Sequence, residues 1–130
     1  MTRSTIDVSG GKALYGGRHL IAWASEIADL IATRFDVARI VLFGSVARGD
    51  DGPDSDIDLL VVLPIVGRRH DTAVSVMTAL RDLPVPLNVV VVDSTRFEEE
   101  ARVPGIIRVA MREGKTLWES TNVREQSADR

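Results

Sequence analysis

Two aspartates, Asp56 and Asp58, open the apolar run at 56–63 and are separated by a single isoleucine. Because side chains alternate between the two faces of a strand, a strand that begins here points both carboxylates to the same face. Two negative charges held so close repel each other, and the run contains no lysine or arginine to offset that repulsion. A divalent metal ion is the natural compensating charge, so the pair predicts a metal site.

A Gly-Ser pair, Gly44 and Ser45, directly follows the preceding apolar run at 38–43. If this run and the run that Asp56 opens pair as antiparallel strands, the Gly-Ser pair lies beside Asp56. A helical turn over 45–48 would aim backbone N–H groups and the serine hydroxyl at an anion. Mg²⁺ typically binds one or two carboxylates and completes its shell with water and substrate phosphates. Together these features predict a site for a metal-bound nucleoside triphosphate.

Other interpretations of the D-x-D pair stay open on these residues alone. Aspartates often cap turns or lie solvated in loops, so the pair by itself is weak evidence. A phosphatase of the aspartyl-phosphate type carries D-x-D at the C-terminal end of an apolar strand, whereas here the apolar run follows the aspartates. A sugar-transferring enzyme with D-x-D normally needs a much larger nucleotide-sugar domain. The combination of Gly-Ser, a turn-rich connection and D-x-D is more specific than its parts.

The composition is that of an ordinary globular domain. The chain has 130 residues, of which 45% are hydrophobic, and a net charge of −3. Its basic residues are scattered, so we expect no general nucleic-acid binding. The absence of cysteine excludes a disulfide framework and a cysteine-based zinc site. No run resembles a signal peptide or a membrane span, so we expect no membrane association and a cytoplasmic location.

The apolar patterns predict an alternation of strands and helices. Continuous apolar runs predict strands at 38–43, 56–63 and 86–92, and a short strand at 115–118. Apolar residues at three- and four-residue spacing predict helices at 18–35, 68–83 and 105–113. This order predicts an α+β fold, in which helices pack on a small mixed α/β sheet.

The predicted domain spans 18–119. The segment 1–17 is rich in glycine and serine and is expected to be loose. The stretch 120–130 is a polar tail.

The ends of the predicted helices carry their own signals. Asp71 is a possible cap for the second helix. Thr95 and Glu98 match a capping box for a short helix after the third strand. Pro104 and Gly114 would bracket the last helix as its N1 and C′ residues.

The segments LFGSVARG, 42–49, and SDIDLLVV, 55–62, resemble the signature of the nucleotidyltransferase superfamily typified by DNA polymerase beta. Within it they resemble the minimal nucleotidyltransferase (MNT) family, over about residues 20–119. The resemblance implies the polymerase-beta-like nucleotidyltransferase fold. It also implies transfer of a nucleoside monophosphate to an acceptor with release of pyrophosphate, with ATP as the expected substrate and Mg²⁺ as the cofactor.

The same resemblance implies a role for each residue of the site. Gly44 and Ser45 would bind the triphosphate. Asp56 and Asp58 would be the catalytic metal ligands, holding metals that clamp the attacking and leaving oxygens. Arg48 is a phosphate ligand or, equally, a surface ion-pair partner.

The third carboxylate of the family is missing from its usual position. That carboxylate opens the third strand, where this chain has Asn88 as the remaining metal-ligand candidate. Asp93 is the only acid in this run, but the helix at 68–83 makes a crossover, so the second and third strands should be parallel. Their starts then lie together, and Asp93 falls about 17 Å away at the far end. Because an amide cannot deprotonate an acceptor, we expect Mg-ATP to bind through Asp56 and Asp58 while transfer is slow or absent. The alternative is that Asn88 merely starts the strand and that a partner supplies the third group.

Many small members of this family are encoded beside a HEPN-domain partner, and some are antitoxins that adenylylate a toxin residue. The resemblance therefore implies a HEPN toxin as partner and protein acceptor. Because the chain has no room for an extra domain that grips the acceptor, a partner or a second copy of this chain in a homo-oligomer would hold it. Two hypotheses follow. One is an active nucleotidyltransferase that modifies its toxin, and the other is an inactive, nucleotide-binding antitoxin that neutralises the toxin by contact.

Overall fold

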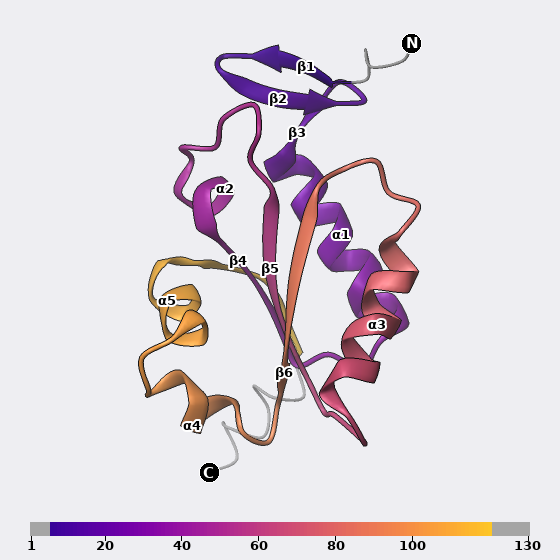
Figure 1. Ribbon diagram of the computed structural model, residues 1–130, viewed down its shortest axis with the longest axis vertical. Coiled ribbons are helices and arrows are strands. Elements are labelled where there is room, and N and C mark those ends of the chain that lie inside the picture. Colours follow the sequence, from indigo (N-terminus) through magenta and orange to yellow (C-terminus); the bar gives the residue numbers. More distant parts are fainter. Residues whose placement is uncertain (1–5, 121–130) are drawn as a thin grey trace.

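The computed structural model describes residues 6–120, which form a mixed four-stranded sheet and a small N-terminal sheet (Figure 1). The strands of the main sheet lie in the order β6-β5-β4-β7. Their bounds are Arg39–Phe43 for β4, Ile57–Leu63 for β5, Leu87–Asp93 for β6 and Lys115–Glu119 for β7. The four strands predicted from the apolar runs are therefore confirmed, each close to its expected bounds.

Helices cover both faces of the main sheet (Figure 1). Their bounds are Leu20–Arg34 for α1, Arg69–Leu80 for α3, Phe97–Ala101 for α4 and Ile106–Glu113 for α5. Strand alternation divides the core in two. Ile40 and Leu42 pack with α1 and α3, whereas Val41 and Phe43 pack with α5. The predicted α+β fold, a mixed sheet with helices packed on it, is confirmed.

The strand register brings the predicted site residues to one end of the main sheet. β4 and β5 are antiparallel, with Phe43 opposite Asp58. β5 and β6 are parallel, with Asp58 opposite Asn88, because α3 makes the crossover between them. The end of β4 therefore meets the starts of β5 and β6, as the sequence predicted.

The N-terminal segment differs from its prediction over residues 6–17, whereas residues 1–5 of the predicted loose segment lie outside the described residues. Instead of lying loose, it forms β1 (Ile6–Ser9), β2 (Lys12–Tyr15) and β3 (Arg18–His19), an antiparallel sheet whose first two strands we call the N-terminal hairpin. Gly-Gly pairs at 10–11 and 16–17 make both turns, with φ values of +62°, +79°, +60° and +79°. Positive φ at both turn residues is what a two-residue hairpin turn requires, so these glycines are turn residues and not linker residues.

Two of the predicted helix caps are wrong. Asp71 lies inside the first turn of α3, whose N-cap is Arg68 without a side-chain hydrogen bond. No side chain caps α4 either, so Thr95 and Glu98 form no capping box. The Thr95 hydroxyl instead donates to Asp93 Oδ1 at 3.0 Å, because the two residues share a tight turn at the end of β6.

The last helix has different ends from those predicted. Gly105 is the N-cap of α5, so Pro104 precedes the helix and is not its N1 residue. Gly114 does end the helix, with an ordinary negative φ of −88°. A Cβ at Gly114 would overlap the backbone oxygens of Ala110 and Leu42. Close approach to β4, and not a left-handed conformation, therefore explains this glycine.

The predicted polar tail lies outside the described residues from position 121 onward. Among the helices of residues 6–120, no helix has the length and apolar character needed to cross a membrane.

Candidate active site

Asp56, Asp58 and Asn88 come together at the end of the main sheet. The Asn88 amide Nδ2 donates to Asp56 Oδ2 at 3.1 Å and to Asp58 Oδ1 at 3.0 Å. Both carboxylates are half-buried, and Asn88 is exposed on the edge strand β6. One neutral amide therefore bridges two negative groups, at the place where the family would carry a third acid.

No ion pair reaches Asp56 or Asp58 from the part of the chain that the structure describes. Within residues 6–120 there is also no group of three or more His, Cys, Asp or Glu side chains that could hold a metal ion. The donor set consists of two carboxylates and one amide. Hard oxygen ligands of this kind fit Mg²⁺, which needs only one or two protein carboxylates when phosphates and water supply the rest.

Gly44 is required at its position by two features of the backbone. Its φ is +78°, in the left-handed region that glycine adopts without strain. A Cβ at this position would also overlap the Asp58 carboxylate. The sequence predicted that Gly44 lies beside the aspartates, and the structure places it directly against one of them.

The helical turn predicted after Gly44 is present as α2 (Gly44–Arg48). Ser45 lies in its first turn, half-buried, with its hydroxyl 3.1 Å from the Ser55 hydroxyl. Ser55 also accepts a hydrogen bond from the Gly52 N–H at 2.8 Å. Ser55 was missed from the sequence, although its place directly before Asp56 was a usable signal.

Arg48 ends α2 and lies in surface ion pairs. Its Nε is 3.3 Å from Asp50 Oδ2, and its Nη1 is 3.7 Å from Glu113 Oε1. The surface-pair interpretation of Arg48 therefore describes this structure, and a contact with phosphate stays a prediction.

Asp93 lies at the opposite end of β6, opposite Leu63. A hydrogen bond from the Thr95 backbone N–H, supported by the Thr95 hydroxyl, lowers the pKa of the Asp93 carboxyl. This carboxylate belongs to the turn after the strand, as predicted, and does not join the site.

Lys12 and Tyr15 of the N-terminal hairpin also lie near the site and were not predicted. Lys12 Nζ donates to Asp51 Oδ1 at 2.8 Å. Burial raises the pKa of the Tyr15 hydroxyl, and so do the charges of Asp56 and Asp54. The prediction of a loose N-terminus gave neither residue a place near the site, although the two Gly-Gly pairs are typical of hairpin turns.

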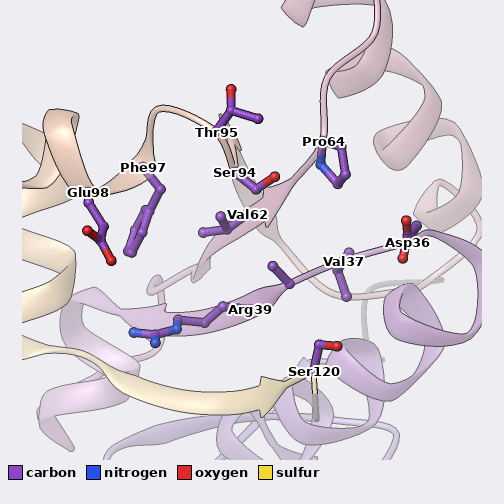
Figure 2. Close-up of a pocket in the computed structure, with 11 residues that line it drawn as sticks. Asp36, Val37, Arg39, Val62, Pro64, Ser94, Thr95, Phe97, Glu98 and Ser120 are labelled. Atoms are coloured by element: carbon purple, nitrogen blue, oxygen red, sulfur yellow. The ribbon is translucent and has the colours of Figure 1, made fainter. Parts of the chain in front are cut away.

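The cavity shown in Figure 2, of about 540 Å³, lies elsewhere. Arg39, Val62, Ser94 and Phe97 line it where β4 begins and where β5 and β6 end. The candidate site occupies the other end of these strands, so this cavity is separate from it. We call it the distal pocket.

The structure thus brings the Gly-Ser turn and the two carboxylates together at one end of the mixed sheet, which is the arrangement that the sequence predicted for a metal-bound triphosphate. Residues 24–117 match the family model described as the nucleotidyltransferase domain, and the chain belongs to this family. The predicted membership of the superfamily is thereby confirmed. No curated protein sequence matches the chain.

Solved structures share the fold. A Sulfolobus solfataricus protein described as a candidate nucleotidyltransferase is 24% identical, with a TM-score of 0.56 over 78% of this chain and 81% of that chain. A mutant of the toxin–antitoxin MntA–HpeT is 20% identical, with a TM-score of 0.51 over 78% of this chain and 76% of that chain.

Proposed function

We propose that this protein is a Mg²⁺-dependent nucleotidyltransferase that transfers AMP from ATP to a protein acceptor. The observation that carries the proposal is the meeting of Gly44 and Ser45 with Asp56 and Asp58 at one end of the main sheet. Membership of the nucleotidyltransferase domain family supports the reaction class.

Each group has a separate task in this reaction. The backbone at Gly44 and the Ser45 hydroxyl bind triphosphate oxygens, which places the α-phosphorus near the carboxylates. Asp56 and Asp58 would hold Mg²⁺, which when bound neutralises charge on the phosphate oxygens. An acceptor hydroxyl oxygen then forms a bond to the α-phosphorus while the bond from the α-phosphorus to the oxygen shared with the β-phosphate breaks, so that pyrophosphate leaves. The proton of the hydroxyl passes to water, because Asn88 cannot take it.

Asn88 limits this reaction. It can offer a metal one neutral oxygen, but its amide cannot take the proton of an acceptor hydroxyl. In the structure it presents Nδ2 to both aspartates, so the amide would have to rotate before its oxygen faced a bound metal. We therefore propose that Mg-ATP binds and that transfer is slow.

The proposed acceptor is a HEPN-domain toxin, which makes the protein an antitoxin. The similarity of the fold to a toxin–antitoxin protein supports this role. The second candidate function is an antitoxin that binds nucleotide and neutralises its toxin by contact alone. The Asn88 amide between the two aspartates favours it, because no third acid is present there.

Mass spectrometry separates the two functions. The chain is co-expressed with a HEPN-domain toxin, and the mass of the toxin is measured after purification. An added AMP that disappears in the Asp56→Asn variant supports transfer, whereas unmodified toxin that is nevertheless neutralised supports contact alone.

Asn88→Asp tests the part played by the amide. It should raise the transfer rate with Mg²⁺ present, because a third carboxylate supplies the missing charge and base. Without metal it should lower the melting temperature, because three carboxylates then repel one another. A melting temperature that does not respond to Mg²⁺ in this variant would contradict the metal assignment.

A further inference from the structure

The N-terminal hairpin lies across the loop that leads into β5 (Figure 1) and is fixed on two sides. On one side, Trp23 Nε1 of α1 donates to the Tyr15 backbone oxygen at 2.8 Å. On the other, Lys12 Nζ donates to the Gly49 backbone oxygen at 2.6 Å and to Asp51 Oδ1 at 2.8 Å. The hairpin therefore connects α1 to the loop at 49–56, which we call the acid loop.

The connection matters for the acid loop because it contains Asp51, a buried carboxylate. It is the one buried charged residue among those that the structure describes, with a side chain only 5% exposed. A buried carboxylate that loses its cation is strongly destabilised. It then either takes up a proton or becomes solvated by movement of the loop. Lys12 therefore stabilises the conformation of the acid loop in which the Asp51 side chain is buried.

The acid loop joins both halves of the candidate site. It runs from the end of α2 to Asp56 at the start of β5. Within it, Gly52 N–H binds the Ser55 hydroxyl, and that hydroxyl lies 3.1 Å from the Ser45 hydroxyl. A loop that opened to expose Asp51 would displace Ser55 and Asp56 relative to Ser45.

We propose that Lys12 is a positioning residue of the nucleotidyltransferase site: through Asp51 and Gly49 it holds the acid loop in the conformation that sets Asp56 against the phosphate-binding turn. Lys12 itself touches neither the carboxylate pair nor Ser45. This inference rests on the proposed function for its effect on nucleotide, whereas its effect on the loop can be measured without nucleotide.

The test compares Lys12→Met with Lys12→Arg and with the control Arg39→Met. Arg39 forms an ion pair of similar length with Glu119, far from the site, and its side chain is about as exposed as that of Lys12, but its partner Glu119 is 26% exposed where Asp51 is 5% exposed. Lys12→Met should speed amide hydrogen exchange in the acid loop and weaken Mg-ATP binding about tenfold, or ~1.4 kcal/mol. Lys12→Arg should restore most of the affinity, because it keeps the cation. Arg39→Met should change neither loop exchange nor Mg-ATP affinity.

A second variant keeps the test decisive if Lys12→Met does not fold. Asp51→Asn removes the same ion pair without leaving a buried charge and keeps the Lys12 contact with the Gly49 backbone oxygen. It should therefore also speed loop exchange and weaken binding, but by less than Lys12→Met. The double variant should be no worse than Lys12→Met alone, because Lys12→Met already breaks the contact that Asp51→Asn removes. Unchanged loop exchange in Asp51→Asn, or effects that add in the double variant, would overturn the proposal. If the wild type does not bind Mg-ATP, the proposed function fails, and loop exchange still decides the role of Lys12.

Discussion

The two ends of the main sheet carry similar polar residues in opposite arrangements. At one end, Asp56 and Asp58 lie together and share only the Asn88 amide. At the other end, Arg39 pairs with Glu119 at 2.9 Å and lies over the Phe97 ring at 5.6 Å. The distal pocket lies at this second end. We propose that metal and phosphate bind at the end where two carboxylates lie together without a cation from the described residues, and not at the end that holds the distal pocket.

The largest difference in ATP affinity is expected between two variants that each change one aspartate, one at either end of the main sheet. Asp58→Asn should weaken Mg-dependent ATP binding about a hundredfold, or ~3 kcal/mol, because the metal loses a charged ligand. Asp93→Asn, the same change on β6 at the other end, should leave binding unchanged. Titration of both variants with ATP, with and without Mg²⁺, measures the difference. Equal affinities would remove the distinction between the ends.

Gly44 and Gly49 distinguish the cost of a steric overlap at the site from the cost of backbone strain alone. Gly44→Ala combines a left-handed φ of +78° with overlap on Asp58, so it should cost ~2–3 kcal/mol of stability and weaken ATP binding. Gly49→Ala has a similar φ of +83° but meets nothing, so it should cost ~1 kcal/mol and spare binding. Chemical denaturation and ATP titration check both variants. A Gly44→Ala protein that binds ATP normally would show that Asp58 tolerates displacement.

A smaller effect is expected from the Ser45 hydroxyl. Ser45→Ala should weaken Mg-ATP binding by ~0.5–1.5 kcal/mol, the usual net contribution of one neutral hydrogen bond. Ser94→Ala in the distal pocket is the matched control and should have no effect on affinity. If both variants bind like the wild type, Ser45 only supports Ser55.

The smallest effect is a pH dependence at the distal end. The pKa of Asp93 in the folded state is lowered from its ordinary value of 3.8, chiefly by the Thr95 backbone N–H. A lowered pKa contributes stability above about pH 3.8 that is lost as the pH falls through the folded-state value. Asp93→Asn should therefore be slightly less stable than wild type at pH 7, and the gap should close in acid. Thermal unfolding at pH 7 and pH 3 would test this, and a constant gap would contradict it.

The sequence predicted the part of the site that depends on topology. The crossover helix between β5 and β6 makes these two strands parallel. Parallel strands place Asn88 beside Asp58 and leave Asp93 at the far end of β6. The apolar runs predicted the strands correctly, because a strand that is buried on both faces needs apolar side chains at consecutive positions.

Contacts between distant segments could not be predicted in the same way. Asp51 looks like one solvated aspartate among several in a turn, and only its pairing with Lys12 makes it a buried charge. The contact of Gly44 with Asp58 depends on side-chain direction, which the spacing of residues does not specify. The N-terminal hairpin was predictable in principle, because two Gly-Gly pairs with apolar and polar residues between them are a stronger signal for turns than overall glycine content is for a loose segment.

The most direct test of the central claim replaces Mg²⁺ with paramagnetic Mn²⁺ and adds ATP. Mn²⁺ broadens the NMR signals of backbone amides that lie near it. The account predicts broadening centred on Gly44, Ser45, Asp58 and Asn88, with the signals around Arg39 unaffected. Broadening centred on the distal pocket, or none that depends on ATP, would contradict the assignment of the nucleotide site.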